Sequence, residues 1–309
     1  MLRRNTRNLR FRSNRVRNIM ALYHEELDPV YGSGEVGVFI DMLFEVFLGW
    51  DKVRLLTSKE QAIDQSDLLR FHWALEDLKR HRPIQHIIGY TDFCGCRIKV
   101  SPDVLIPRPE TEGMVEFLIR TSKSGNQKSP NSELRASNYL DLCTGSGCIA
   151  IALKKAFPRA EVTAVDLSEK ALAVAQQNAE NNNVAINFIQ ADLLDSNFNF
   201  QFSIFNFIVS NPPYVRESER AAMYANVLDY EPEQALFVPD DDPLRFYRAI
   251  ANIAKERLAK DGLLVAEINE AFAKETCALL SGMGFSPAVH TDFRGRPRWI
   301  SAKKIVYNL

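Results

Sequence analysis

The chain has 309 residues, of which 46% are hydrophobic and 25% are charged, and its formal net charge at pH 7 is −1. This composition is that of a globular protein with enough apolar mass for a core, and the length favours two domains. No stretch approaches the roughly 18 to 20 apolar residues of a membrane span, so we expect neither an integral membrane protein nor a membrane partner.

The first 20 residues differ in charge from the rest of the chain. They hold seven arginines and neither an acid nor a lysine, which leaves 31 basic and 39 acidic residues for 21–309, a net charge of −8. High charge and low apolar content predict a disordered basic extension over 1–19. The segment lacks the apolar centre of a secretory signal, so the alternatives are an organelle transit peptide, a nucleic-acid arm, or translation that starts at Met20.

A small helical domain is predicted over 20–83. Apolar residues recur at helical spacing from Glu35 to about Leu78, and Asp and Ser stand at suitable helix starts. From 84 to 107 the pattern changes to short β-rich pieces interrupted by Gly and Pro, which predicts a β-hairpin linker between two domains. A further helix is expected from Glu110.

Residues 108–309 are predicted to form a second, larger domain. After a polar run at 121–138, which we expect to be a mobile surface loop, short apolar segments alternate with helical patterns of about 10 to 15 residues. This alternation predicts βαβ crossovers, and therefore an α/β domain with a doubly wound, mostly parallel sheet of Rossmann-like type. Ligands of such sheets bind at the carboxyl ends of the strands, where every motif described below falls.

The histidines and cysteines predict no metal site. The five histidines form no cluster, and the cysteines lack zinc-site spacing, although the close pair Cys94 and Cys96 leaves a redox or metal pair as an alternative. Free thiols in a reducing cytosol are the preferred interpretation, and we expect a cytoplasmic protein. The cysteines are Cys94, Cys96, Cys143, Cys148 and Cys277.

A predicted strand runs into a glycine-rich turn and then into a helix. Gly145 and Gly147 let a ligand approach the backbone, and Ala150 lets the helix pack close to the strand. Asp166 follows Gly147 by 19 residues at the end of the next strand, where it can accept hydrogen bonds from a ribose diol. These features fit NAD and S-adenosylmethionine equally.

Two further carboxylates favour the methyl donor. Asp141 lies at the mouth of the first strand, where it would repel a pyrophosphate and attract the ammonium and sulfonium groups of S-adenosylmethionine. The alternative role of Asp141 is to cap the following helix or to hold the loop. Asp192 ends the third strand and is suited to accept a hydrogen bond from the adenine amino group.

The fourth strand ends in the sequence Asn211-Pro212-Pro213-Tyr214. The prolines end the strand and fix the backbone. A planar NH₂ group is a poor nucleophile, and we expect the Asn211 side-chain oxygen and the Pro212 carbonyl to fix it for attack on a methyl group, with Tyr214 over its plane. This motif suits an amide and an adenine amine equally.

From about Arg82 to the C-terminus the chain resembles the HemK/PrmC family of protein-glutamine methyltransferases. The matching stretches occur in the family's order and are RPIQHIIG, VLIPRPETE, DLCTGSGCIAIAL, VDLSEKAL, IVSNPPYV and EPEQAL. The resemblance implies a class I methyltransferase domain that uses S-adenosylmethionine. It further implies methylation of the side-chain amide nitrogen of the glutamine in the Gly-Gly-Gln motif of peptide-chain release factors, with the helical domain helping to dock the factor.

The resemblance also implies individual roles, in which the glycine loop wraps the methionine end, Asp166 holds the ribose and Asp192 borders the adenine. The residues expected to bind the cofactor are Asp141, Cys143, Thr144, Gly145, Ser146, Gly147, Asp166, Leu167, Asp192, Leu193 and Asn211. Those expected to bind the glutamine are Arg108, Glu110, Asn211, Pro212, Pro213 and Tyr214, of which Asn211, Pro212 and Tyr214 are assigned to catalysis. Pro109 and Glu112 are expected beside Arg108 near the site entrance, the alternative being a charged helix start.

Three departures from the family pattern bear on the cofactor site. Cys143 stands where the family commonly has Gly, Leu193 replaces a frequent aromatic residue, and the stretch VPDDDPLRFY lacks the usual glycines. We expect a slightly less open loop and weaker adenine stacking, whereas the Asn211 motif is unaffected.

Two other functions compete with the preferred one. An adenine-specific nucleic-acid methyltransferase would use the same motif on a flipped base. The net charge of −8 over 21–309, the lack of a clustered basic patch and the lack of an added target-recognition domain oppose it. A non-catalytic cofactor-binding protein is opposed by the intact Asn211 motif. We therefore expect an enzyme without direct nucleic-acid contacts. We also expect it to be a monomer.

Overall fold

The computed structural model describes residues 11, 13–125, 137–195, 204–292 and 294–305. The chain divides into two compact units. The first comprises Met1–Gly89 with Ala225–Tyr230, and the second comprises Tyr90–Tyr224 with Glu231–Leu309. The predicted mobile loop at 121–138 falls largely outside the described residues, and its first five residues instead continue a helix that ends at Gly125.

The first unit is helical, as predicted. Its buried apolar side chains form one core in which Tyr23, Phe44 and Phe71 are fully enclosed, and the Tyr23 hydroxyl donates to the Phe71 carbonyl at 2.6 Å. Gly49, in the left-handed conformation, ends the second helix. The helices are α1 (Val16–Tyr31), α2 (Ser33–Leu48), α3 (Lys52–Thr57), α4 (Gln65–Leu78), α5 (Ile84–Ile88) and, from the later segment, α9 (Ala225–Leu228).

Helix α1 corrects the predicted disordered extension over 1–19. The prediction is wrong for 13–19, because α1 begins at Val16, whose side chain is fully buried in the helical core together with that of Ile19. Arg17 pairs with Glu60 at 2.6 Å. The burial of Val16 and Ile19 outweighs the two neighbouring arginines that the structure describes, Arg15 and Arg17, which are exposed. Met20, the alternative start, lies inside the helix, and residues 1–10 and 12 are outside the described part.

The hairpin is shorter than the predicted segment 84–107. Its strands are β1 (Tyr90–Phe93) and β2 (Cys96–Lys99), and the turn between them has positive φ at both residues, Cys94 and Gly95. Residues 84–88, expected to be β-rich, form α5 instead, because a short apolar run fits either state and Gly89 ends it as a left-handed helix cap.

The hairpin belongs to the second unit and is fastened to helix α8 (Glu169–Asn181). The Asn178 side chain accepts from the Lys99 backbone N–H at 2.7 Å and donates to the Lys99 carbonyl at 2.9 Å. Asn182, just past the helix, donates to the Arg97 carbonyl at 2.9 Å. The hairpin is thus an attached part of this unit and not a free linker.

The second unit is built on a seven-stranded sheet with the order β10-β11-β9-β6-β3-β4-β5. The five strands from β9 to β5 in this order are parallel, and β11 pairs antiparallel with both β9 and β10. The strands are β3 (Asn138–Leu142), β4 (Glu161–Asp166), β5 (Asn187–Gln190), β6 (Phe205–Ser210), β9 (Leu258–Glu267), β10 (Phe285–Thr291) and β11 (Pro297–Lys304). The predicted α/β fold with a mostly parallel sheet is confirmed.

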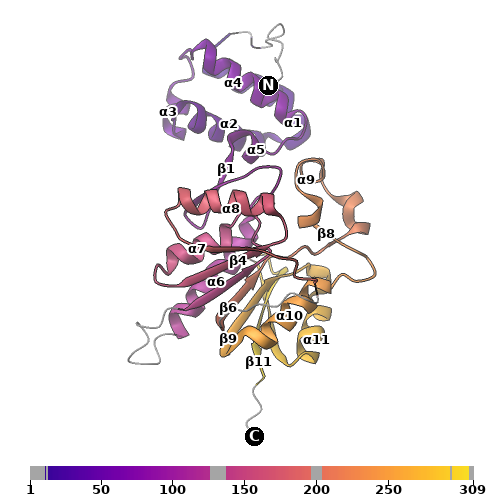
Figure 1. The fold of residues 1–309 in the computed structure, drawn as a ribbon. Helices are drawn as coiled ribbons and strands as arrows, with labels where there is room; N and C mark the ends of the chain where they lie inside the picture. Colours follow the sequence, from indigo (N-terminus) through magenta and orange to yellow (C-terminus); the bar gives the residue numbers. More distant parts are fainter. Residues whose placement is uncertain (1–10, 12, 126–136, 196–203, 293, 306–309) are drawn as a thin grey trace. The chain divides into compact units, whose positions relative to one another are not determined.

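Helices cover both faces of this sheet (Figure 1). Alternate residues of a strand enter separate cores: Tyr139 of β3 packs with α6 (Pro109–Gly125) and α7 (Cys148–Ala156), whereas Leu140 packs with α10 (Arg245–Arg257) and α11 (Ala273–Gly282). This alternation is the doubly wound arrangement. Shorter elements complete the unit: β7 (Val215–Arg216), β8 (Phe237–Val238), η3 (Glu217–Ala222), η4 (Glu233–Ala235) and η5 (Glu270–Phe272).

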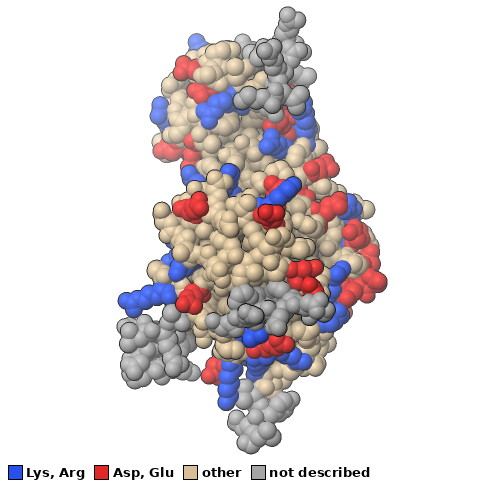
Figure 2. All heavy atoms as spheres, viewed as in Figure 1, with Lys and Arg blue, Asp and Glu red and all other residues tan. Residues whose placement is uncertain are grey.

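Figure 2 shows basic and acidic side chains interspersed over the face that it displays. Within the described ranges, none of the helices is long and apolar enough to cross a membrane.

Candidate functional site

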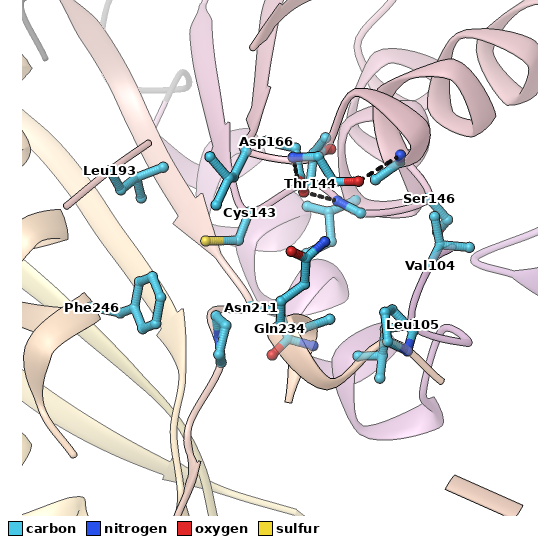
Figure 3. Close-up of a pocket in the computed structure, with 18 of the residues that line it drawn as sticks. Val104, Leu105, Cys143, Thr144, Ser146, Asp166, Leu193, Asn211, Gln234 and Phe246 are labelled. Atoms are coloured by element: carbon cyan, nitrogen blue, oxygen red, sulfur yellow. Dashed lines mark hydrogen bonds between the residues drawn. The ribbon is translucent and has the colours of Figure 1, made fainter. Parts of the chain in front are cut away.

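A cavity of about 340 Å³ opens at the carboxyl ends of β3, β4, β5 and β6. The chain leaves β3 toward β4 and β5 on one side and later returns to β6 on the other, so the cavity lies at the topological switch point of the sheet. In Figure 3, Leu193 and Phe246 border it on one side and Val104 and Leu105 on the other. The position and size are those of a small-molecule site.

The glycine-rich loop after β3 forms one wall of the cavity. Cys143, Gly145 and Gly147 have φ values of 61°, 53° and 80°, a left-handed path that favours glycine. A Cβ atom at Gly147 would lie 3.0 Å from the Cβ of Ala175, so the loop also depends on glycine where α7 approaches α8. Asn178 donates to the Ser146 carbonyl at 2.9 Å and fixes the loop from α8. Cys143, Thr144, Gly145 and Ser146 line the cavity, whereas Gly147 does not.

Asp141 lies beneath the loop and not in the cavity. Its side chain is fully buried, and Oδ2 accepts hydrogen bonds from the Thr144 hydroxyl at 2.6 Å and the Ala150 backbone N–H at 3.2 Å. Burial raises the pKa of Asp141 to about 7, against the opposing effect of these two hydrogen bonds. This geometry matches the alternative role of Asp141, which is to cap the following helix or to hold the loop. Its Oδ2 atom accepts from Thr144 in the loop and from Ala150 in the first turn of α7.

Asp166 and Asp192, which are predicted to bind the cofactor, both line the cavity. The two oxygens of Asp166 accept from the backbone N–H groups of Gly145 at 2.8 Å and Ser168 at 2.9 Å, which orients the carboxylate at the end of β4. Burial raises the pKa of Asp166, and the backbone hydrogen bonds oppose that shift. Asp192 accepts from the Leu194 N–H at 2.8 Å. A carboxylate has about four lone-pair sites, so each of these aspartates retains acceptors for a ligand.

The turn after β6 contributes Asn211 and Pro213 to the cavity, while Pro212 and Tyr214 are not among the lining residues. Asn211 Nδ2 donates to the Thr111 hydroxyl at 3.3 Å. The Tyr214 hydroxyl donates to Glu267 Oε1 at 2.8 Å, and burial, followed by the charge of Glu267, raises the pKa of Tyr214 well above its ordinary value. The ring of Tyr214 therefore packs beside the site and does not lie over the cavity, since its hydroxyl is directed to Glu267.

Arg108 and Glu110, expected to bind the substrate, do not line the cavity either. Arg108 Nη2 pairs at 2.6 Å with Glu231 Oε1, whose side chain is 1% exposed, and Glu231 also accepts from the Ile106 N–H at 3.2 Å. Arg108 thereby holds the segment that carries Gln234, a residue that does line the cavity. Pro109 begins α6, which confirms the charged helix start.

Glu112 has a structural partner away from the site. Its Oε1 accepts from the backbone N–H of Cys94 at 2.7 Å, which links the first turn of α6 to the turn of the hairpin. All five cysteines are described and carry free thiols. Burial, reinforced by Asp166, raises the pKa of the Cys143 thiol, so Cys143 presents a neutral group to the cavity.

Several residues of the site were missed by sequence reasoning, among them Thr111, Gln234, Phe246 and Glu267. Thr111, Gln234 and Phe246 line the cavity, and Phe246 lies on the same side as Leu193, where the sequence lacked an expected aromatic residue. Glu267 ends β9 as Asp166 ends β4, so the rule that singled out acidic strand ends would also have found it. Thr111 stands between the two glutamates of PRPETE, where only the charged residues had drawn attention.

Family models match both units of the chain. The PrmC N-terminal domain matches residues 32–89, and the methyltransferase small domain matches residues 128–236.

Two relatives that match over most of the chain carry the same name. The chain is 40% identical over 287 residues to the release factor glutamine methyltransferase of Flavobacterium psychrophilum, covering 92% of this chain and 98% of that protein. It is 38% identical over 287 residues to the release factor glutamine methyltransferase of Bacteroides thetaiotaomicron, covering 93% and 99%. The crystal structure of the hMettl16 catalytic domain in complex with the MAT2A 3'UTR hairpin 6 shares the fold with a TM-score of 0.51 at 15% identity, covering 82% of this chain and 87% of that one.

Proposed function

The chain belongs to the family of release factor glutamine methyltransferases, and we propose that it transfers a methyl group from S-adenosylmethionine to the side-chain amide nitrogen of the glutamine in the Gly-Gly-Gln motif of peptide-chain release factors. The observation that carries this proposal is the position of Asn211, whose side chain borders the cavity at the switch point of a methyltransferase sheet. The substrate implies action on the translation machinery in the cytoplasm, and we expect the enzyme to act as a monomer.

The residues around the cavity fit S-adenosylmethionine. Asp166 presents an oriented carboxylate to a ribose diol, and Leu193 and Phe246 supply apolar surface for a purine ring. Among the lining residues, Asp103, Asp166 and Asp192 outnumber one basic residue, Arg245, so the lining is acidic on balance, which suits a ligand that carries an ammonium and a sulfonium. When bound, S-adenosylmethionine supplies an electrophilic methyl group.

The chain's own residues position the amide that accepts the methyl group. The nitrogen lone pair of an amide is delocalised, so the amide must be held in line with the methyl group by hydrogen bonds to both N–H groups. The Asn211 oxygen and the Pro212 carbonyl are the two acceptors that we assign to this task. Pro212 and Pro213 are buried. Their rings fix φ and keep the turn rigid, and neither residue has a backbone N–H to donate.

Methylation of an adenine amino group is the alternative reaction. It would require the protein to hold a nucleic-acid backbone, and 21–309 carries 31 basic against 39 acidic residues. Basic and acidic side chains are interspersed on the face that Figure 2 displays. The charge distribution therefore favours a protein substrate.

The test is a transfer assay with radiolabelled S-adenosylmethionine. The protein is incubated with a release factor, with the same factor carrying Gln→Asn in its Gly-Gly-Gln motif, or with double-stranded DNA. We expect label in the unaltered factor alone. Label in DNA but not in the factor would overturn the proposal in favour of adenine methylation.

A further inference from the structure

Three side chains from separate elements form a continuous hydrogen-bonded path from the cavity into the protein. Asn211 follows β6, and its Nδ2 donates to Thr111 Oγ1 at 3.3 Å in the first turn of α6. Thr111 Oγ1 lies 2.6 Å from Glu267 Oε2 at the end of β9. The register of the parallel pair β6 and β9 places Ser210 opposite Ala266, so the next residues, Asn211 and Glu267, are neighbours.

The number of hydrogens on these groups fixes the direction of every bond in the path. With Glu267 ionised, its carboxylate only accepts, and a hydroxyl has a single hydrogen to donate. Thr111 therefore donates that hydrogen to Glu267 and presents only lone pairs to Asn211. The group of Asn211 that faces Thr111 must then be the NH₂ group, which leaves the side-chain oxygen on the opposite branch of the amide.

We propose that Glu267 and Thr111 are positioning residues that fix the amide of Asn211 with its oxygen free to accept a hydrogen bond from the substrate amide. The inference rests on the proposed function, because a substrate NH₂ group is what would use this oxygen. Neither residue is assigned a contact with the reacting atoms. Both act through the orientation of Asn211.

An asparagine needs such a device because its two orientations have nearly the same shape. Rotating the terminal amide by half a turn exchanges oxygen and NH₂, and steric packing barely distinguishes the two. In the reversed orientation a donor would face the donor of the substrate amide. Hydrogen bonding from a neighbour of fixed polarity is therefore the available means of choosing the productive orientation.

Two hydroxyl donors, Thr111 and Tyr214, keep the carboxylate of Glu267 an acceptor against the effect of burial, which raises its pKa. Thr111 is 1% exposed and Glu267 is 4% exposed, so water competes little for their hydrogen bonds. The Tyr214 hydroxyl donates to Glu267 Oε1 at 2.8 Å, so each carboxylate oxygen has its own hydroxyl donor. A buried carboxylate is costly compared with an apolar side chain of similar size, and the orientation of Asn211 is a benefit that an apolar residue would not give.

The decisive variant is Thr111→Val, which keeps the shape of the side chain and removes its hydroxyl. We expect kcat for release-factor methylation to fall roughly 10-fold or more, with the Kd for S-adenosylmethionine changed by less than about 3-fold. Thr111→Ser restores a hydroxyl and should recover most of kcat. Glu267→Gln should also lower kcat, because its NH₂ group must face one of the two hydroxyls and reverse that bond.

A matched control separates the path from a general loss of a buried hydroxyl. Thr276 is fully buried in α11, and its hydroxyl donates to the Phe272 carbonyl at 2.8 Å. Thr276→Val removes the same group from the same unit and should leave kcat unchanged. Melting temperatures of all variants report folding, and Glu267→Gln and Thr111→Ser keep the test decisive if Thr111→Val does not fold.

A double-mutant cycle shows whether Thr111 acts through Asn211. The variant Thr111→Val/Asn211→Ala should be no slower than Asn211→Ala alone, since the hydroxyl then has no amide to orient. Additive losses would overturn the inference, as would a folded Thr111→Val enzyme with wild-type kcat or a Thr111→Ser enzyme as slow as Thr111→Val. An unaltered protein that fails to label the release factor contradicts the proposed function instead, so the two failures are distinguishable.

Discussion

The loop after β3 and the turn after β6 both border the cavity, but they are held in different ways. In the β3 loop, Asp141 bonds to Thr144 and Ala150, three and nine residues away along the chain. In the β6 turn, Asn211 bonds to Thr111, 100 residues away, and Thr111 bonds to Glu267, 156 residues away. The loop on the cofactor side is thus organised by two successive βα units, with Asp166 and Asn178 21 and 32 residues from their partners in the loop, whereas the turn on the reacting side depends on α6 and β9.

This difference separates two kinds of defect. A change in the β3 loop or at Asp166 should weaken cofactor binding or alter stability, because these residues shape the wall of the cavity. A change in the β6 turn should lower turnover with little effect on the cofactor. The variants below test this division, from the largest expected effect to the smallest.

Asn211→Ala should have the largest effect. Removing the oxygen that we assign to the substrate amide should lower kcat by roughly 10² or more, the scale for losing one oriented polar contact in a transition state. Calorimetric affinity for S-adenosylmethionine should stay within a few-fold. Asn206→Ala is the matched control, because Asn206 lies at the other end of β6 and bonds to the Asn138 N–H at 2.9 Å. Unchanged kcat in Asn211→Ala would remove Asn211 from the reaction.

Asp166→Ala should act on binding and not on turnover at saturation. Losing charge-assisted hydrogen bonds to the ribose should weaken the Kd for S-adenosylmethionine by roughly 10-fold to 100-fold. Asp261→Ala, an exposed aspartate on β9 of the same unit, serves as the control. Equal calorimetric affinities for Asp166→Ala and the unaltered protein would exclude Asp166 from the ribose site.

Asp141→Asn should change how stability depends on pH. The pKa of Asp141 is raised from 3.8 to about 7, so the folded state holds a proton that the unfolded state has released between these values. Stability contributed by this group is therefore full below pH 4 and is lost as pH rises to 7, at about 1.4 kcal/mol per pH unit. Urea unfolding should show this slope as the difference between the unaltered protein and Asp141→Asn, and a pH-independent difference would contradict it.

Tyr214→Phe should have the smallest effect on turnover. It removes one of the two hydroxyls that bond to Glu267 and leaves the bond from Thr111 in place. We expect kcat to fall by roughly 3-fold to 10-fold, about the effect of one ordinary hydrogen bond, because the loss reaches Asn211 only indirectly. Steady-state kinetics give the measurement. A loss as large as that of Asn211→Ala would mean that Tyr214 contacts the substrate directly.

Sequence reasoning was most successful where the controlling contacts are local. The strand and helix order of the second unit, the glycine loop, Asp166 and Asp192 follow from spacing along the chain, because a βαβ unit brings its own strand ends together. Helix α5 was predicted as β-rich, since five residues carry too little pattern to distinguish a strand from a helix. The start of α1 was missed because seven arginines obscured two buried apolar positions.

The contacts of the β6 turn were beyond such reasoning. Asn211 could be identified from its motif, but its partners come from the first turn of α6 and the end of β9. Tyr214 was expected over the substrate because its motif reveals an aromatic ring but not the direction of its hydroxyl. Only the assembled sheet brings Glu267 beside Asn211, and the hydroxyl of Tyr214 then has a buried acceptor.

The helical unit contains a late segment of the chain, and this has a consequence for its synthesis. Residues 225–230 belong to that unit, and the Tyr230 hydroxyl donates to the Arg80 carbonyl at 2.8 Å across 150 residues of sequence. A ribosome that has translated the first 89 residues has therefore made only part of the unit. The remaining contacts form once residue 230 has left the exit tunnel, so the helical unit is completed only after the glycine loop and the Asn211 turn of the other unit have been synthesised.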